Sequence, residues 1–177
     1  MLPASSALPY AEVPVTVARA LVWFRPAGLP GYRFRVSLSP EETSFLQRQH
    51  AAAMITIGRS GVPKPVRVGV ALVDGRLWSS GTQDRVRTRR LRRDPRCTLF
   101  VFDQAFSWLA LETTVTILDG PEAAAQNVRL FREMQGRPAG PLNWYGSELD
   151  EDAFVRLMTE ERRLVYEFDV HRSYGLA

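Results

Sequence analysis

The chain has 177 residues, of which 45% are hydrophobic, and a formal net charge of +4 at pH 7. This length favours a single domain with a sizeable core, and the basic charge keeps an anionic ligand, a nucleic acid or a membrane surface open as partners. The single cysteine, Cys97, excludes an internal disulfide and favours a reducing cytoplasm. Only two histidines are present and no paired Cys/His spacing occurs, so we expect no metal site.

The N-terminal part of the chain is unlike the rest. Its prolines would interrupt any long element: Pro3, Pro9, Pro14, Pro26 and Pro30. The apolar run Ala18–Phe24 contains Arg19 and is far shorter than the roughly 20 residues of a membrane span. No basic segment precedes this run, which argues against a signal peptide. We therefore expect residues 1–35 to be a flexible extension or an over-extended start, and residues 36–177 to form one domain.

Short apolar and β-branched runs alternate with helical patterns from Ser39 onwards. The expected strands are Ala52–Gly58, Val66–Val73, Arg76–Ser80, Cys97–Phe102, Trp108–Leu118 and Leu164–Val170. The expected helices are Pro40–Gln49, which starts in a capping box, Arg85–Arg93, Pro121–Gln135 and a helix capped by Asp150 that ends near Glu160. Hairpin turns at Arg59-Ser60-Gly61 and Asp74-Gly75 favour antiparallel pairing. These patterns predict a mainly β fold with flanking helices (α+β), in the form of a closed antiparallel barrel.

The segment Leu77–Phe102 carries the densest group of charges. Seven arginines fall within twelve positions: Arg85, Arg87, Arg89, Arg90, Arg92, Arg93 and Arg96. They follow a strand and a segment rich in hydroxyls and glycine that we interpret as a turn: Ser79, Ser80, Gly81 and Thr82. Asp94-Pro95 is expected to end the arginine-rich helix. Free backbone N–H groups, hydroxyls and guanidinium groups in this order are suited to hold a phosphate or another anion.

Four segments carry a resemblance to a known family: LSPEETSFLQRQHAAAMITIGRSGVPKPVRVGVAL, RVRTRRLRRDPRCTLFVF, ETTVTILDGPEAA and RSYGL. Through them, the chain from Ser39 to Leu176 resembles the pyridoxamine-5′-phosphate-oxidase-like split β-barrels, and within these the actinobacterial branch that uses the deazaflavin coenzyme F420. Arg67 matches an arginine that binds the cofactor phosphate in flavin-using members. Arg87 occupies a basic position that is usually lysine, and Arg90 replaces an asparagine of the family pattern. The resemblance implies an FMN-binding split β-barrel of six or so antiparallel strands.

The same resemblance implies an oxidoreductase that uses coenzyme F420 for hydride transfer to or from a small organic substrate, with FMN as the alternative cofactor. The implied cofactor-binding residues are Arg67, Val68, Gly69, Ser79, Ser80, Thr82, Arg85, Val86 and Arg87. A cytoplasmic homodimer with the cofactor near the subunit interface is also implied. The chain has no recognisable catalytic triad, P-loop or Rossmann fingerprint, so the cofactor would carry the chemistry.

Other readings of these residues remain open. A nucleic-acid binder would explain the arginines, but the arginine-rich helix lacks interleaved aromatic residues, so neither a nucleic acid nor a membrane is expected as partner. A non-catalytic carrier of a flavin, a deazaflavin or a haem would use the same barrel. Arg89, Arg92 and Arg93 fit a solvated helix face. Aromatic residues such as Trp108, Trp144 and Tyr145 fit a core or a dimer contact, and Cys97 fits inert packing.

Overall fold

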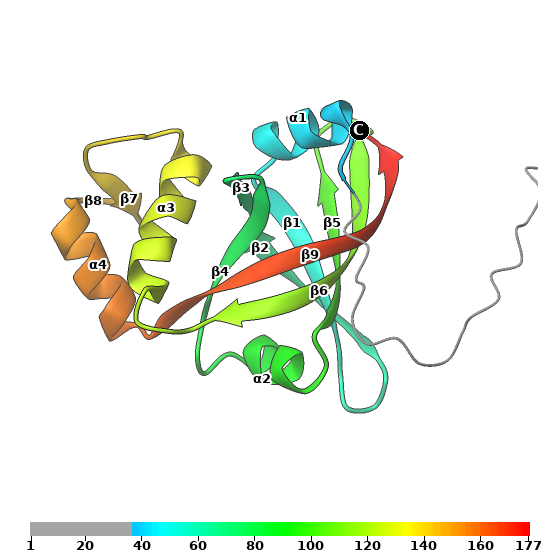
Figure 1. Ribbon diagram of the computed structural model, residues 1–177, viewed down its shortest axis with the longest axis horizontal. Coiled ribbons are helices and arrows are strands. Elements are labelled where there is room, and N and C mark those ends of the chain that lie inside the picture. The colour runs from blue at the N-terminus through cyan, green and yellow to red at the C-terminus, as the bar shows by residue number, and fades with distance from the viewer. Residues whose placement is uncertain (1–36) are drawn as a thin grey trace, which may run out of the picture. The chain divides into compact units, whose positions relative to one another are not determined.

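The computed structural model describes residues 37–177, which belong to one compact unit (Figure 1). The helices in this range are α1 (Pro40–Arg48), α2 (Val86–Arg93), α3 (Ala123–Gln135) and α4 (Glu151–Glu160). The strands are β1 (Ala51–Ile57), β2 (Pro63–Gly69), β3 (Ala71–Val73), β4 (Arg76–Thr82), β5 (Arg96–Phe102), β6 (Trp108–Leu118), β7 (Leu142–Trp144), β8 (Ser147–Leu149) and β9 (Arg163–Leu176). The prediction that residues 1–35 form a flexible extension lies outside the described residues.

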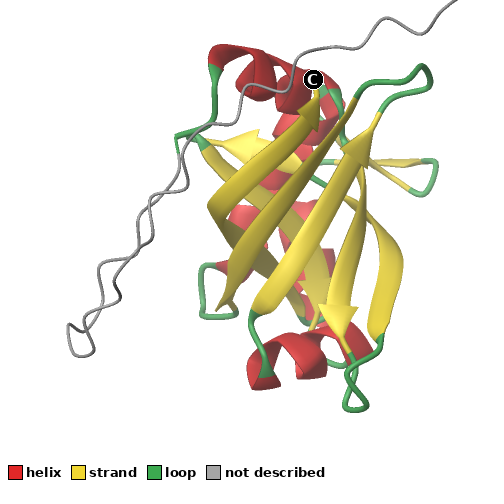
Figure 2. Cartoon of the chain, turned by 90° about the vertical axis from the view of Figure 1, so that its right-hand side faces the viewer, coloured by secondary structure: helices red, strands yellow, loops and turns green. Residues whose placement is uncertain are grey.

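Seven strands form one antiparallel sheet in the order β2-β1-β5-β6-β9-β4-β3. The edge strands β2 and β3 are separated in sequence by Val70 alone, so the sheet must curl until its two edges approach each other (Figure 2). The predicted mainly β, split-barrel fold is therefore confirmed. Two details were wrong. The predicted single strand Val66–Val73 is divided at Val70, where the chain stops pairing with β1 and starts pairing with β4. The barrel was predicted to be closed, but among the described residues no ladder joins its two edges.

Alternate side chains of the curled sheet fill its interior. Met54, Leu99 and Leu111 are fully buried there, on three neighbouring strands. Phe45 and Leu46 of α1 and Leu91 of α2 join the same cluster. In Figure 1 these two helices lie at opposite ends of the barrel. The sheet's interior is thus a packed core, and a ligand site must lie outside it.

The helix ends follow the sequence signals. The Ser39 hydroxyl accepts a hydrogen bond from the Glu42 N–H (3.2 Å), and the Ser39 N–H donates to the Glu42 carboxylate (2.8 Å), so the predicted capping box is confirmed. α2 ends at Arg93 with Asp94 as its C-cap, directly before Pro95, as predicted. In the part of the chain that the structure describes, no helix has the length and apolar character needed to cross a membrane.

The hydroxyl-rich segment before α2 is part of a strand, which corrects its interpretation as a turn. Ser79, Ser80, Gly81 and Thr82 belong to β4 and pair with β9, and the turn comes only at residues 83–84. Gly81 allows this pairing, because a Cβ there would lie 2.4 Å from Cζ and Oη of Tyr166. β9 starts early enough to extend the β4 ladder to Thr82, and local turn propensity does not reveal this partner.

The segment between β6 and β9 forms a lobe of its own beside the barrel, seen at the left of Figure 1. Its core consists of Val128, Leu142, Phe154 and Met158. The lobe is made of α3 and α4, which the sequence analysis predicted, and of the β7–β8 hairpin, which it did not predict. On the side of α3 that faces the sheet, Leu130 packs with Val73 of β3 and Trp78 of β4. This contact holds the lobe against the edge of the sheet where β3 and β4 lie.

Candidate functional site

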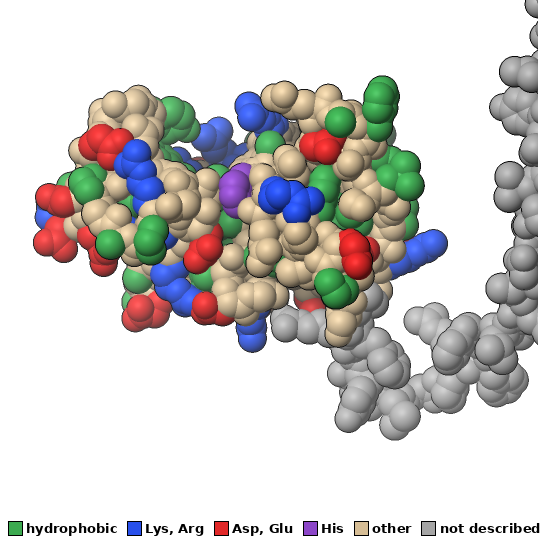
Figure 3. Space-filling view, turned by 90° about the horizontal axis from the view of Figure 1, so that it is seen from above, with side chains coloured by type: hydrophobic (Ala, Val, Ile, Leu, Met, Phe, Trp, Pro, Cys, Tyr) green, Lys and Arg blue, Asp and Glu red, His purple; other side chains and the backbone are tan. Residues whose placement is uncertain are grey.

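A cavity of about 500 Å³ is lined by both the barrel and the lobe. Its cationic wall consists of Arg67 on β2, Arg85 and Arg87 at the start of α2, and Arg163 at the start of β9. Its other wall is mostly aromatic and comes from the lobe: Phe131, Met134, Trp144 and Tyr145. In the space-filling view, basic side chains lie in the hollow between the lobe at the left and the barrel (Figure 3). One end of the cavity therefore suits an anion and the other suits a ring.

Most of the residues proposed from the sequence come together in this cavity. Those that line it are Arg67, Val68, Gly69, Ser80, Arg85 and Arg87. Ser79, Thr82 and Val86 lie outside its lining. The alternation of β4 explains part of this, since Ser79 is fully buried on the barrel side while Ser80 faces the cavity. Val86 is half exposed and faces a different cavity, described below.

The cationic wall carries charge that the described residues do not neutralise. Arg163 pairs with Glu161 (2.7 Å), but within residues 37–177 the guanidinium groups of Arg67, Arg85 and Arg87 have no carboxylate partner. The Nε of Arg87 is buried without a hydrogen-bond partner in this range. A buried donor on a charged group is costly to leave unpaired. An anion in the cavity would supply the missing partner.

The first turn of α2, which carries Arg87, is held by a hydrogen-bonded chain. The Thr88 hydroxyl donates to the Thr82 carbonyl (2.7 Å), and the Tyr166 hydroxyl lies 2.5 Å from the same Thr88 oxygen. Because Thr88 has one proton and gives it to the carbonyl, the Tyr166 hydroxyl donates to Thr88. The guanidinium of Arg87 lies 5.9 Å from the centroid of the Tyr166 ring. The position of Arg87 is thus fixed by the barrel itself.

A second set of contacts positions Ser80. Its hydroxyl donates to the Asn127 side-chain oxygen of α3 (2.5 Å), and Arg163 Nη1 donates to the Ser80 oxygen (3.4 Å). Asn127, which is fully buried, donates in turn to the Ala123 carbonyl (2.7 Å). Ser80 therefore links the lobe to the cationic wall, and its hydroxyl proton is already engaged.

Sequence reasoning missed the lobe side of the cavity. It assigned Trp144 and Tyr145 to a core or a dimer contact, and it did not consider Phe131, Met134 or Arg163. These residues approach β2 and α2 only because α3 packs on the sheet edge, which is a tertiary contact without a local signature. The one available local signal was the Tyr145-Gly146 pair, which forms the turn of a hairpin.

A second basic cavity, of about 660 Å³, lies on the other face of α2. Its cationic side chains are Arg59, Lys64, Arg89, Arg90 and Arg93, and none of them pairs with a carboxylate among residues 37–177. Arg92 differs from these, since it lies on a half-exposed surface and pairs with Asp119 (2.8 Å). The helix thus presents one basic face to the first cavity, another to the second, and an ion-paired position between them.

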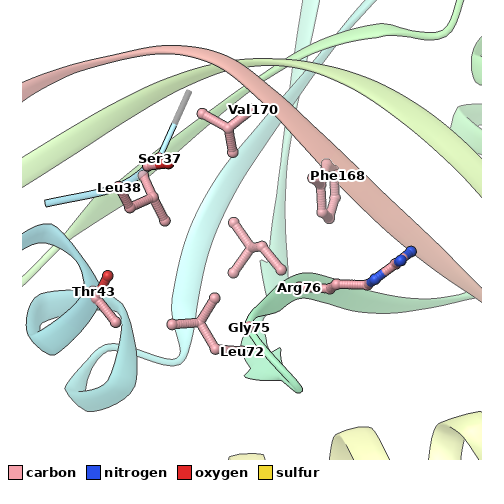
Figure 4. Close-up of a pocket in the computed structure, with 9 residues that line it drawn as sticks. Ser37, Leu38, Thr43, Leu72, Gly75, Arg76, Phe168 and Val170 are labelled. Atoms are coloured by element: carbon pink, nitrogen blue, oxygen red, sulfur yellow. The ribbon is translucent and has the colours of Figure 1, made fainter. Parts of the chain in front are cut away.

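The remaining hollows offer less chemistry. One of about 270 Å³ lies between α1, the β3–β4 hairpin and β9, and it is lined by apolar side chains such as Leu72 and Val170 (Figure 4). Arg76 extends to the side of this hollow and pairs with Glu167 (2.6 Å). Cys97 lines another, but burial raises its pKa to about 12, so the thiol is not a nucleophile near neutral pH. Within residues 37–177 no cluster of side chains could hold a metal ion.

The curled antiparallel barrel and the basic cavity at its edge are typical of a family of cofactor-binding proteins, and the sequence assigns this chain to the same family. Residues 38–166 match the pyridoxamine 5′-phosphate oxidase family, and the chain belongs to that family. The family is named after pyridoxamine 5′-phosphate oxidase, an oxidoreductase, and its fold is one that binds flavin-type cofactors. No curated protein is significantly similar to the chain in sequence.

Solved structures share the fold at low sequence identity. A conserved hypothetical protein from Mycobacterium tuberculosis is 23% identical, with a TM-score of 0.62 over 81% of this chain and 88% of that one. An F420 reductase is 19% identical, with a TM-score of 0.54 over 74% of this chain and 94% of that one. An FAD-binding protein from Mesorhizobium loti is 14% identical, with a TM-score of 0.52 over 78% and 94% of the two chains. At these identities the likeness shows the fold alone.

Proposed function

We propose that this protein is an oxidoreductase that binds coenzyme F420 and transfers a hydride to or from a small organic substrate. The observation that carries the proposal is the cationic wall, where Arg67, Arg85 and Arg87 line one cavity without carboxylate partners among residues 37–177. The donor set fits a phosphate, because guanidinium groups form strong charge-assisted hydrogen bonds with phosphate oxygens. The volume of about 500 Å³ is within the range of cofactor sites.

In this proposal the side chains bind and orient, and the deazaflavin ring, when bound, accepts or donates the hydride. Arg87 and Arg67 hold the phosphate from two neighbouring elements, α2 and β2. Phe131 and Met134 on α3 close the apolar side of the cavity and exclude water from it. Among residues 37–177, no histidine, aspartate or glutamate lines the cavity.

The choice of F420 over FMN rests on the second basic cavity. F420 carries an oligoglutamate tail and is therefore more negatively charged than FMN. The five cationic side chains on the other face of α2 would attract such a tail, whereas FMN has no group to reach them. FMN stays the alternative cofactor, because the first cavity alone would serve its phosphate.

A non-catalytic carrier is the second candidate function, because the described lining holds no histidine, aspartate or glutamate to act as a general acid or base. The same lining has neither a histidine nor a cysteine, but it contains Met134 and Tyr145, whose residue types also bind haem iron, so haem stays among the ligands of such a carrier. A carrier and an enzyme would bind the cofactor equally well, so binding does not separate them.

Two measurements test the proposal. The first is a fluorescence titration of the protein with F420, F420 lacking its glutamates, FMN and FAD, in which we expect the tightest binding for full-length F420. The second is the oxidation of reduced F420, followed by absorbance, with a panel of quinone, nitro and enone acceptors. Turnover would identify an enzyme, and tight binding without any turnover would identify a carrier. Failure of F420 to bind would contradict the proposal.

We also propose that the protein acts as a homodimer. Several large apolar side chains are exposed near the β5–β6 turn and the C-terminal end of β9: Phe102, Phe106, Tyr174 and Leu176. Phe100 and Trp108 form ring contacts beside them, with centroids 5.5 Å apart. An exposed aromatic patch of this kind is typical of a protein–protein interface.

A further inference from the structure

The turn of the β7–β8 hairpin contains a residue that the turn itself disfavours. Tyr145 and Gly146 connect Trp144 to Ser147, and their φ angles are +48° and +91°. A two-residue hairpin with two positive φ angles prefers Asn, Asp or Gly at its first position, because other side chains are strained there. The same chain follows this rule at Asp74-Gly75, where the φ angles are +49° and +72°. Tyrosine is therefore an unfavourable choice for the turn.

The described fold gains little packing from the Tyr145 ring in return. Its exposed fraction is 88%, which is larger than that of any other exposed tyrosine or tryptophan in the described range. The ring touches Trp144 edge-on, with centroids 4.9 Å apart. A large aromatic side chain that is both strained and exposed calls for a partner outside the described fold.

The hairpin holds this ring in a defined place. Gln135 of α3 accepts a hydrogen bond from the Asn143 N–H and donates one to the Asn143 carbonyl, both at 2.8 Å. The Asn143 side chain accepts from the Gly146 N–H (3.2 Å). Trp144 packs edge-on against Phe131 (centroids 5.2 Å apart) and lies under the Arg163 guanidinium (4.6 Å to its ring centroid). The hairpin is thus anchored on α3 and on β9, and the Tyr145 ring is presented from a rigid support.

Tyr145 lines the same cavity as the unpaired arginines. Anionic groups are attracted to Arg67, Arg85 and Arg87, while Tyr145 and Trp144 offer aromatic surface on the lobe side. A molecule that uses both walls has a negatively charged group joined to a flat ring. Stacking of such a ring on an aromatic side chain contributes about 0.5–1.5 kcal/mol beyond simple burial, or roughly two- to tenfold in affinity.

We propose that Tyr145 is a ligand-contacting residue whose ring stacks on the planar ring of an aromatic anion held by the arginines of this cavity. The proposal deepens the proposed function and rests on it in one respect, because the stacked ring belongs either to the cofactor or to a planar substrate bound against the cofactor. Both of these sources present a flat ring to Tyr145. The turn keeps a strained residue because that residue serves the ligand.

The experiment uses a probe that does not depend on the proposed function. Pyranine, a flat aromatic trianion, and tripolyphosphate, an anion without a ring, are titrated into the full chain and three variants. We expect Tyr145→Asn to bind pyranine about two- to tenfold more weakly and tripolyphosphate unchanged. Tyr145→Phe should bind both like the wild type, and Arg87→Ala should bind both more weakly. Pyranine affinity of Tyr145→Asn within twofold of the wild type would overturn the proposal.

Thermal unfolding separates this role from a structural one. Asparagine suits the first position of the turn, so Tyr145→Asn should unfold at the same temperature as the wild type or about 1–3 °C higher. A lower Tm would show that the Tyr145 ring supports the fold and would overturn the proposal.

Titration with F420 and FMN then identifies the source of the ring. Weaker cofactor binding by Tyr145→Asn assigns the stacked ring to the cofactor, and unchanged cofactor binding with a raised KM for a planar acceptor assigns it to the substrate. Loss of pyranine binding in Tyr145→Asn, together with no binding of either cofactor to the wild type, would contradict the proposed function and leave Tyr145 as a ligand contact. Cofactor binding and KM that are both insensitive to Tyr145→Asn would contradict the stacking role and leave the proposed function intact.

Discussion

Replacement of Arg87 by alanine is the perturbation that bears most directly on the cationic wall. Arg87 lines the main cavity, its Nε is buried without a hydrogen-bond partner, and no carboxylate among residues 37–177 neutralises it. If it holds a phosphate, Arg87→Ala removes a charged hydrogen bond worth about 1.5–3 kcal/mol. This corresponds to roughly ten- to a hundredfold weaker binding of reduced F420.

Arg92→Ala is the matched control on the same helix. Arg92 pairs with Asp119 on a half-exposed surface, and such pairs contribute less than about 1 kcal/mol. We therefore expect Arg92→Ala to bind F420 within about fivefold of the wild type. Because both variants remove one positive charge from α2, the difference between them isolates the contact from the overall charge.

Isothermal titration calorimetry at two salt concentrations is the assay. Raising the salt should weaken the wild type more than Arg87→Ala, since the lost contact is the one that salt screens. Arg87→Ala should also keep a Tm close to that of the wild type, because it removes a charge that has no carboxylate partner among the described residues. Equal F420 affinities for the wild type and both variants would refute the reasoning and remove the main support for the cofactor assignment.

Three further outcomes are expected. Gly81→Ala should lower the free energy of unfolding by about 1–3 kcal/mol, because its Cβ would lie 2.4 Å from the fully buried Tyr166 ring. Gly120→Ala is the control and should be neutral, since its Cβ would meet no heavy atom within 4 Å, and equal Tm values for the two variants would contradict this reasoning. Cys97, whose pKa is raised to about 12 by burial, should react with a thiol reagent at pH 8 only after unfolding, and fast reaction of the native protein would show an accessible thiolate. Light scattering should give the mass of a dimer, with Phe102→Asp shifting it toward the monomer, and a monomeric wild type at micromolar concentration would exclude the exposed aromatic patch as a dimer contact.

Local signals in the sequence predicted most of the elements correctly. The capping box at Ser39, the Asp74-Gly75 turn and the stop at Asp94-Pro95 each depend on a few neighbouring residues, and each is present in the structure. The strand Trp108–Leu118 was predicted with the same bounds that the structure gives it. The split at Val70 could not be predicted in this way, because both sides of it have strand-forming residues and only the curl of the sheet decides where the partner changes.

The candidate site was predicted on its barrel side and missed on its lobe side. Arg67, Ser80 and Arg87 were proposed from the family resemblance and from the charge pattern, and they line one cavity. Tyr145 contributes from a hairpin far along the chain, and its place opposite the arginines depends on how α3 packs against β3 and β4. Such packing between distant segments has no pattern in a single sequence, whereas charge density and strand alternation do.

The central claim is that the cavity between the barrel and the lobe holds the phosphate of the cofactor. A crystal structure of the protein in complex with F420 tests this most directly. We predict that the phosphate lies within hydrogen-bonding distance of Arg87 and Arg67, with the oligoglutamate tail directed toward the basic face of α2 that carries Arg89 and Arg93. A phosphate bound in the second basic cavity or elsewhere on the surface, with Arg87 and Arg67 free of it, would contradict the account.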